Sequence, residues 1–215
     1  MRIDVVKSVL EASDTLAQEN RDRLTAAGVL AINIMSAPGS GKTTLLQKTI
    51  PALLPGCRSA VLVGDLQTTR DAERLGDLGA PVDQINTGKG CHLSPAEIAE
   101  GIKHLDLDAI DVLFIENVGN MVCPAAFDLG EHARVILLST PEGDDKVAKY
   151  PTLFQGAAAI LLTKTDLAEL LEYDRDQVRQ DLSQINSVAP LMELSSKTGE
   201  GVDAWFAWLR EQVTR

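Results

Sequence analysis

The sequence predicts an α/β fold with a mostly parallel β-sheet flanked by helices on both faces. First, short apolar runs alternate with stretches of helical character along most of the chain. Second, runs such as VLAINIM and VLFI are continuously apolar, which is typical of parallel strands covered on both faces. The predicted strands are residues 29–35, 60–63, 111–115, 134–139, 158–162 and 191–194.

A helix is expected before the first strand. Apolar residues recur at helical spacing from Ile3 to Ala27, and Gly28 is placed to end the helix. This pattern fits either a lid packed on the core or a docking site for a partner. At the other end, Trp205 and Trp208 lie at helical spacing, which predicts a closing helix whose tryptophans pack in the core.

The composition and charge of the chain exclude several classes of protein. A chain of 215 residues is long enough for a single large domain with its own core. Its net charge of -11 repels nucleic-acid phosphates, so we expect no nucleic-acid binding. The apolar runs are shorter than the roughly 20 residues of a membrane helix, and no signal peptide is visible, so we expect a cytoplasmic protein without membrane contact. Three irregularly spaced cysteines suggest free thiols.

A phosphate-binding loop follows the first predicted strand. The segment SAPGSGKT matches the P-loop pattern G-x-x-x-x-G-K-[ST], except that Ser36 stands at the first glycine position. We expect backbone N–H groups to face the phosphates, Lys42 to contact the β- and γ-phosphates, and Thr43 to bind Mg²⁺. The predicted phosphate-binding residues are Gly39, Ser40, Gly41, Lys42, Thr43 and Thr44.

Two segments at later strand ends favour guanine over adenine. Thr163-Lys164-Thr165-Asp166 resembles the N-K-x-D motif of GTPases, with threonine in place of asparagine. There the aspartate accepts hydrogen bonds from guanine and the lysine stem lies along the base, which implies these roles for Asp166 and Lys164. The segment SSKTG resembles the S-A-K loop that covers the base, which adds Ser196 and Lys197 to the predicted GTP site.

Two acidic residues, Asp65 and Glu116, stand at the ends of predicted strands. The segment from Glu116 to Gly119 resembles the D-x-x-G switch of GTPases, with glutamate in place of aspartate. We assign catalytic roles to Lys42 and Glu116. Asp65 is either a second Mg²⁺ contact or the cap of the next helix.

Thiol and imidazole groups form a candidate metal site. Cys91 and His92 precede a helix start marked by the capping box S-P-A-E, and Cys123 follows the switch. Sulfur and nitrogen ligands suit Ni²⁺ or Zn²⁺, and three of them leave the coordination incomplete unless water or a second subunit contributes. On residue types alone, unconnected buried thiols and a solvated histidine are the simpler alternative.

The motifs GKGCHLSPAEI, IENVGNMVCPAAFDLGE and EGDDKVAKYP around the P-loop resemble the HypB family of hydrogenase nickel-incorporation GTPases over nearly the whole chain. The resemblance implies an amphipathic helix, residues 1–28, on a P-loop GTPase domain, residues 29–215. It also implies a metallochaperone that binds and hydrolyses GTP and helps to insert nickel into [NiFe]-hydrogenase. Implied partners are a second copy in a GTP-linked homodimer, a HypA-type nickel chaperone and, indirectly, the hydrogenase large subunit.

In that family the counterparts of Cys91, His92 and Cys123 hold metal at the subunit interface. The C-x-x-C-G-C and histidine-rich motifs of some members do not occur in this sequence, so we expect handover rather than storage of nickel. We further expect GTP and Mg²⁺ to order residues 116–119 and so to move Cys123 relative to the other two ligands.

Hydrolysis is expected to be slow, because no arginine or glutamine is clearly placed to polarise water. Three alternatives are open. The first is nickel delivery to another enzyme, such as urease. The second is a P-loop kinase for a small molecule. The third is a regulatory GTPase whose cysteine and histidine residues are structural.

Overall fold

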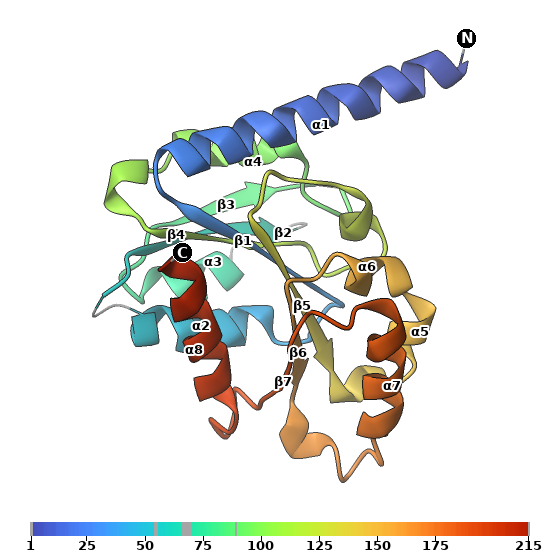
Figure 1. The fold of residues 1–215 in the computed structure, drawn as a ribbon. Coiled ribbons are helices and arrows are strands. Elements are labelled where there is room, and N and C mark those ends of the chain that lie inside the picture. Colours follow the sequence, from blue (N-terminus) through green and yellow to red (C-terminus); the bar gives the residue numbers. More distant parts are fainter. Residues whose placement is uncertain (1, 54–55, 66–69, 89, 215) are drawn as a thin grey trace.

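Seven parallel strands form the central sheet of the computed structural model, which describes residues 2–53, 56–65, 70–88 and 90–214 (Figure 1). The strands are β1 (Leu30–Ser36), β2 (Ser59–Asp65), β3 (Val82–Asn86), β4 (Val112–Glu116), β5 (Ala133–Ser139), β6 (Ala159–Thr163) and β7 (Leu191–Glu193). Their order is β3-β2-β4-β1-β5-β6-β7, and every adjacent pair is parallel. The predicted α/β fold class is confirmed.

Helices cover both faces of this sheet (Figure 1). They are α1 (Arg2–Ala26), α2 (Lys42–Leu53), α3 (Arg70–Gly76), α4 (Pro95–Lys103), α5 (Lys146–Lys149), α6 (Pro151–Gln155), α7 (Arg175–Ile185) and α8 (Val202–Val213). One core lies beneath α2, α3 and α8, and the opposite face buries two clusters, beneath α1 with α4 and beneath α5 to α7. Within the described ranges, none of the helices has the length and apolar character that crossing a membrane requires.

The sequence located six of the strands but not β3. The missed strand, Val82–Asn86, pairs only with β2 at one edge of the sheet, and its residues are partly or largely exposed. Edge strands carry polar residues and lack the continuous apolar run by which buried parallel strands are recognised.

The leading helix α1 packs across α4 (Figure 1). Leu24 is fully buried in the cluster that also contains Ile98 and Ile102 of α4. Asn20 is buried too, and its side-chain amide donates to the carbonyls of Pro95 at 2.8 Å and Leu129 at 3.1 Å. The C-terminal half of α1 is therefore fixed to the segments that begin α4 and lead into β5.

The closing helix α8 occupies its predicted range, residues 202–213. Trp205 is fully buried, and its indole N–H donates to the Thr49 hydroxyl at 2.9 Å. Trp208 stacks on Trp205 with ring centroids 5.4 Å apart but is only partly buried. Trp208 thus lies at the rim of the core, whereas the sequence pattern had placed both rings inside it.

Gly130 should be much less tolerant of alanine than Gly28. Both have positive φ, +90° and +70°, and an L side chain in that region costs about 1–2 kcal/mol. A methyl group at Gly130 would also lie 2.4 Å from the Ala17 carbonyl oxygen of α1, whereas one at Gly28 meets nothing within 4 Å. In chemical denaturation, we expect Gly130→Ala to lower the free energy of unfolding at least about twice as much as Gly28→Ala. Equal losses would contradict this close packing.

Candidate functional site

The P-loop connects β1 to α2 at the centre of the sheet. The chain leaves β1 at Ser36 and enters α2 at Lys42. Gly39 and Gly41 have φ of +76° and +101°, which glycine adopts without strain. The sheet order changes direction at β1, because the next strand along the chain, β2, lies beyond β4 on one side, while β5 lies on the other. Such a switch point at the carboxyl ends of parallel strands is where α/β proteins bind nucleotides.

Ser36 fits the P-loop although it replaces a glycine. It is fully buried as the last residue of β1, and its φ is not positive, so the position requires no glycine conformation. Its hydroxyl donates to the Ala37 carbonyl at 2.7 Å and accepts from Lys42 Nζ at 2.9 Å. Burial lowers the pKa of Lys42, while Glu116 is the strongest charge acting in the opposite direction. Ser36 therefore holds the lysine at the phosphate-binding loop.

Glu116 joins the P-loop from the end of β4. Its side chain is buried, with Oε1 accepting from the Thr43 hydroxyl at 2.7 Å and Oε2 without a hydrogen-bond partner among the described residues. An unpartnered carboxylate oxygen beside a threonine hydroxyl fits the oxygen ligands that Mg²⁺ prefers. Asp65 ends the neighbouring strand β2, and its charge raises the pKa of Lys42, as does that of Asp71 in α3. Asp71 was not predicted, because no motif marks it.

Burial raises the pKa of Glu116 to about 7, above its ordinary value of 4.5. Because the folded state binds this proton more tightly than the unfolded state, the protein should lose stability as pH rises from about 4.5 through 7. We expect Glu116→Gln, which cannot ionise, to gain stability relative to the wild type across that interval, by a few kcal/mol. Denaturant titrations of both proteins without nucleotide or Mg²⁺ measure the difference. A difference that does not change with pH would contradict the burial effect.

The two segments predicted to bind guanine meet the P-loop around one cavity of about 270 Å³. Its lining residues are Ser40, Gly41, Thr44, Thr163, Lys164, Asp166, Leu167, Ser195, Ser196 and Lys197. Asp166 Oδ1 accepts from the Ser195 hydroxyl at 2.6 Å, which links the two motifs. Lys164 has a φ of +58° and reaches back to donate to the Gly39 carbonyl at 2.7 Å. The geometry brings together all the residues predicted to contact the base.

Thr163 stabilises the wall of this cavity, although the N-K-x-D motif of GTPases has asparagine at this position. Its buried hydroxyl donates to the Ser40 carbonyl of the P-loop at 2.8 Å. Ser40 in turn donates to Glu142 Oε1 at 2.6 Å, a contact that the sequence did not predict. The threonine thus ties the P-loop to the end of β6 by a direct hydrogen bond.

The three predicted metal ligands lie together near the same edge of the sheet. Ligand atoms of Cys91, His92 and Cys123 are all within 4.8 Å of one another, with Cys91 exposed and the other two half-buried. The Cys123 thiol raises the pKa of Cys91. Two sulfurs and one imidazole nitrogen suit Ni²⁺ or Zn²⁺ and leave at least one coordination position for another ligand. The remaining cysteine, Cys57, is buried near the end of α2 and lies outside this group.

Hydrogen bonds, a short helix and one ring contact surround these ligands. The predicted capping box is confirmed, because Ser94 and Glu97 exchange hydrogen bonds at the start of α4, directly after the Cys91 loop. Cys123 begins a 3₁₀ helix, Cys123–Ala126. Phe127 follows and stacks on the His92 ring with centroids 4.1 Å apart. The stacking was not predicted, because nothing in the local sequence indicates which residue meets His92.

Comparison with known proteins identifies the family. The family described as "CobW/HypB/UreG, nucleotide-binding domain" matches residues 30–193. The hydrogenase maturation factor HypB of Escherichia coli K12 is 45% identical over 210 residues, which cover 98% of this chain and 72% of that protein. The hydrogenase/urease maturation factor HypB of Helicobacter hepaticus is 44% identical over 204 residues, covering 93% and 84%.

A solved structure agrees with these matches. The crystal structure of HypB from Helicobacter pylori in complex with nickel superposes with a TM-score of 0.90 at 40% identity, covering 94% of this chain and 95% of that one. The fold, with its P-loop at the centre of a parallel sheet, is that of nucleotide-hydrolysing P-loop proteins. The chain therefore belongs to the hydrogenase maturation factor HypB family.

Proposed function

We propose that this protein is a GTP-dependent metallochaperone that helps to insert nickel into [NiFe]-hydrogenase. One observation carries the proposal: the short stretch from Glu116 to Cys123 begins at the P-loop threonine and ends at the three-residue sulfur and nitrogen cluster. The Helicobacter pylori relative was crystallised with nickel, which supports nickel as the cargo of this cluster. Zn²⁺ fits the same ligands and is the competing metal.

In this proposal GTP and Mg²⁺ bind along the carboxyl ends of the strands. Lys42 and the backbone of residues 39–44 would contact the phosphates, and Asp166 the guanine. Thr43, with Glu116 and Asp65, would hold Mg²⁺, which supplies positive charge next to the transferred phosphate when it is bound. No motif of the sequence assigns an arginine or glutamine to polarise the attacking water, so we expect slow hydrolysis without a partner.

Replacing Asp166 with asparagine should remove the preference for GTP. The carboxylate accepts hydrogen bonds from the ring N–H and the exocyclic amine of guanine, and an asparagine amide turns a donor toward them. We expect GTP affinity to fall about a hundred-fold and ATP to compete as well as GTP. Competition binding measures both effects, with Glu169→Gln, an exposed residue nearby, as the control. Unchanged discrimination against ATP would contradict the role of Asp166, and a wild type that prefers ATP would favour the kinase alternative.

We also propose a homodimer linked to GTP binding. The cluster offers three ligands and needs at least one more, and the neighbouring Val122 is 61% exposed beside Cys123. A second copy docked there would cover the valine and complete the coordination. Metal stoichiometry and oligomer size, measured without nucleotide, with GDP and with a GTP analogue, test this. A monomer that binds nickel in all three states would contradict the dimer.

The thiol groups of the cluster also indicate the cellular compartment of the protein. Two exposed or half-exposed thiols stay available for metal only in a reducing compartment, so we place the protein in the cytoplasm. A HypA-type chaperone would supply nickel, and the hydrogenase large subunit would receive it. We keep the division into the helix of residues 1–28 and the GTPase domain of residues 29–215 as part of this proposal.

Urease is the second candidate target, because the Helicobacter hepaticus relative is named for both hydrogenase and urease maturation. The two targets are distinguished by deleting the gene and measuring nickel incorporation into each enzyme. Loss of hydrogenase nickel alone supports the first candidate, and loss of urease nickel alone supports the second.

A further inference from the structure

Two asparagines of the segment after β4 hold the loop that carries Cys91 and His92. The Asn117 side-chain oxygen accepts from the backbone N–H of Leu93 at 3.2 Å. The Asn120 side-chain amide donates to the backbone carbonyl of Cys91 at 3.3 Å. The backbone is therefore bonded to the same short segment on both sides of His92.

That segment also contacts the nucleotide edge. It starts at Glu116, which accepts from the Thr43 hydroxyl. At Gly119 the chain lies against the P-loop so closely that an added methyl group would be 2.8 Å from the Cα atom of Pro38. Close packing transmits displacement, so a shift of the P-loop must move residues 116–119 as well.

Asn120 bonds to both thiol-bearing stretches at once. Besides donating to Cys91, its side-chain oxygen accepts from the backbone N–H groups of Val122 at 2.8 Å and Cys123 at 3.4 Å. One amide thus fixes the Cys91 backbone relative to the Cys123 backbone. In this structure the two cysteines cannot separate unless that hydrogen bond breaks.

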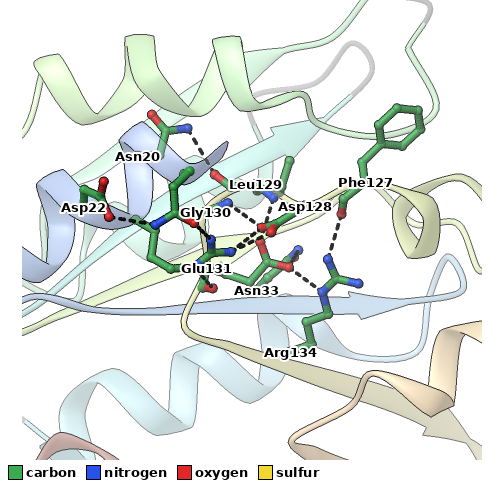
Figure 2. A network of polar contacts seen from close by, with 11 residues as sticks. Asn20, Asp22, Asn33, Phe127, Asp128, Leu129, Gly130, Glu131 and Arg134 are labelled. Atoms are coloured by element: carbon green, nitrogen blue, oxygen red, sulfur yellow. Dashed lines mark hydrogen bonds and ion pairs between the residues drawn. The ribbon is translucent and has the colours of Figure 1, made fainter. Parts of the chain in front are cut away.

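Asn117 is anchored in a buried polar network. Its amide donates to Asn33 Oδ1 at 3.2 Å, and the Asn33 amide donates to Glu131 Oε1 at 3.3 Å. Glu131 is paired with Arg134 at 2.6 Å, and Arg134 donates to the Phe127 carbonyl at 3.0 Å. Figure 2 shows the dashed contacts that join Glu131 to Arg134 and Arg134 to the Phe127 carbonyl.

This buried network connects Asn117 to the surroundings of His92. It ends at Phe127, whose ring stacks on His92, and both Asn33 and Glu131 are buried. Asn20 of α1 adds a bond to Leu129 in the same turn (Figure 2). The ring of His92 therefore contacts one end of this network, while the backbone on both sides of His92 bonds to the segment that contacts the P-loop.

We infer that Asn117 and Asn120 are positioning residues that carry the movement of residues 116–119 to Cys91 and His92. The inference rests on the proposed function, because it concerns how nucleotide changes nickel affinity. It changes the expected mechanism: the nucleotide-linked shift acts on the backbone of both cysteines through one amide, and not on Cys123 alone through the covalent chain.

The test uses two substitutions at Asn120, which is only partly buried, so that folding is little affected. Asn120→Asp keeps an oxygen for Val122 and Cys123 but has no N–H for the Cys91 carbonyl. Asn120→Ala loses both. Nickel affinity is measured by competition with a chelator, once with GDP and once with a non-hydrolysable GTP analogue. The ratio of these two nickel affinities is then compared between the variants and the wild type. The charge that aspartate adds is present in both nucleotide states, so its effect cancels in the ratio.

We expect wild-type protein to show a ratio of about ten and both variants a ratio close to one, with GTP affinity unchanged and the thiolate-to-nickel absorption band retained. Asn86→Asp is the matched control, since it adds the same charge near the loop while its oxygen still accepts from Gly88. It should keep the wild-type ratio.

The outcomes distinguish failure of the proposed function from failure of the positioning role of Asn120. A wild type that binds no nickel, or has a ratio of one, overturns the proposed function. A wild-type ratio retained by Asn120→Asp overturns the inference alone. Loss of the ratio in Asn86→Asp as well would also overturn the inference, because charge and not the hydrogen bond would then be responsible.

Discussion

Replacing Lys42 with alanine should reduce GTP affinity by about a hundred-fold or more. The ammonium group would make charge-assisted hydrogen bonds to two phosphates, each worth about 1.5–3 kcal/mol. The fold should survive this substitution. Burial disfavours the charged form of Lys42 and lowers its pKa, so removing the side chain also removes the desolvation cost of a buried charge. Nucleotide titration followed by fluorescence or calorimetry measures the affinity, and thermal unfolding checks the fold.

Lys48→Ala is the matched control for Lys42→Ala, because it removes an exposed lysine from the same helix. It should bind GTP like the wild type. If Lys42→Ala keeps its GTP affinity within a few-fold, the proposed phosphate site is wrong. A variant that unfolds would appear in the thermal melt, and Lys42→Met, which retains the apolar stem, then repeats the measurement in a folded protein.

Replacing Cys123 or Cys91 with alanine should abolish stoichiometric nickel binding. Each substitution removes one of the three ligand atoms that lie within 4.8 Å of one another, and the two that remain offer too few donors for a soft metal site. We expect nickel affinity to fall about a hundred-fold or more, while GTP affinity stays unchanged. Equilibrium dialysis with metal analysis measures bound nickel per chain.

Cys57→Ala is the control for these two variants. Cys57 is also a free cysteine, but it is buried away from the cluster, so nickel stoichiometry should not change. Wild-type nickel binding by both Cys91→Ala and Cys123→Ala would instead support the alternative in which the protein is a regulatory GTPase and its cysteines are structural.

The sequence predicted those parts of the fold and site that depend on local pattern. The buried strands β1, β2 and β4 to β7 were found by their continuous apolar runs. The P-loop and the capping box at Ser94 were found because consecutive residues build them. Residues that are close together in the chain determine such features, so a single sequence is enough to predict them.

The missed features depend on contacts between distant segments. Phe127 meets His92, and Asn33 meets Glu131, only because β1, β5 and the start of α4 converge in space. Asn117 and Asn120 belong to a recognised motif, but their bonds to the Cys91 loop have no counterpart in local pattern. The proposed metal ligands are therefore connected to buried polar residues far away in the chain as well as to their own backbone neighbours.

The most direct test of the central claim is the affinity of the wild-type protein for nickel in its two nucleotide states. The segment that starts at Glu116 contacts both the P-loop threonine and the Cys91 loop, so nucleotide and metal should influence one another. We predict nickel affinities that differ about tenfold between GDP and a non-hydrolysable GTP analogue, both with Mg²⁺. Equal affinities, with nucleotide bound in each case, would contradict the claim that nucleotide state controls the metal site.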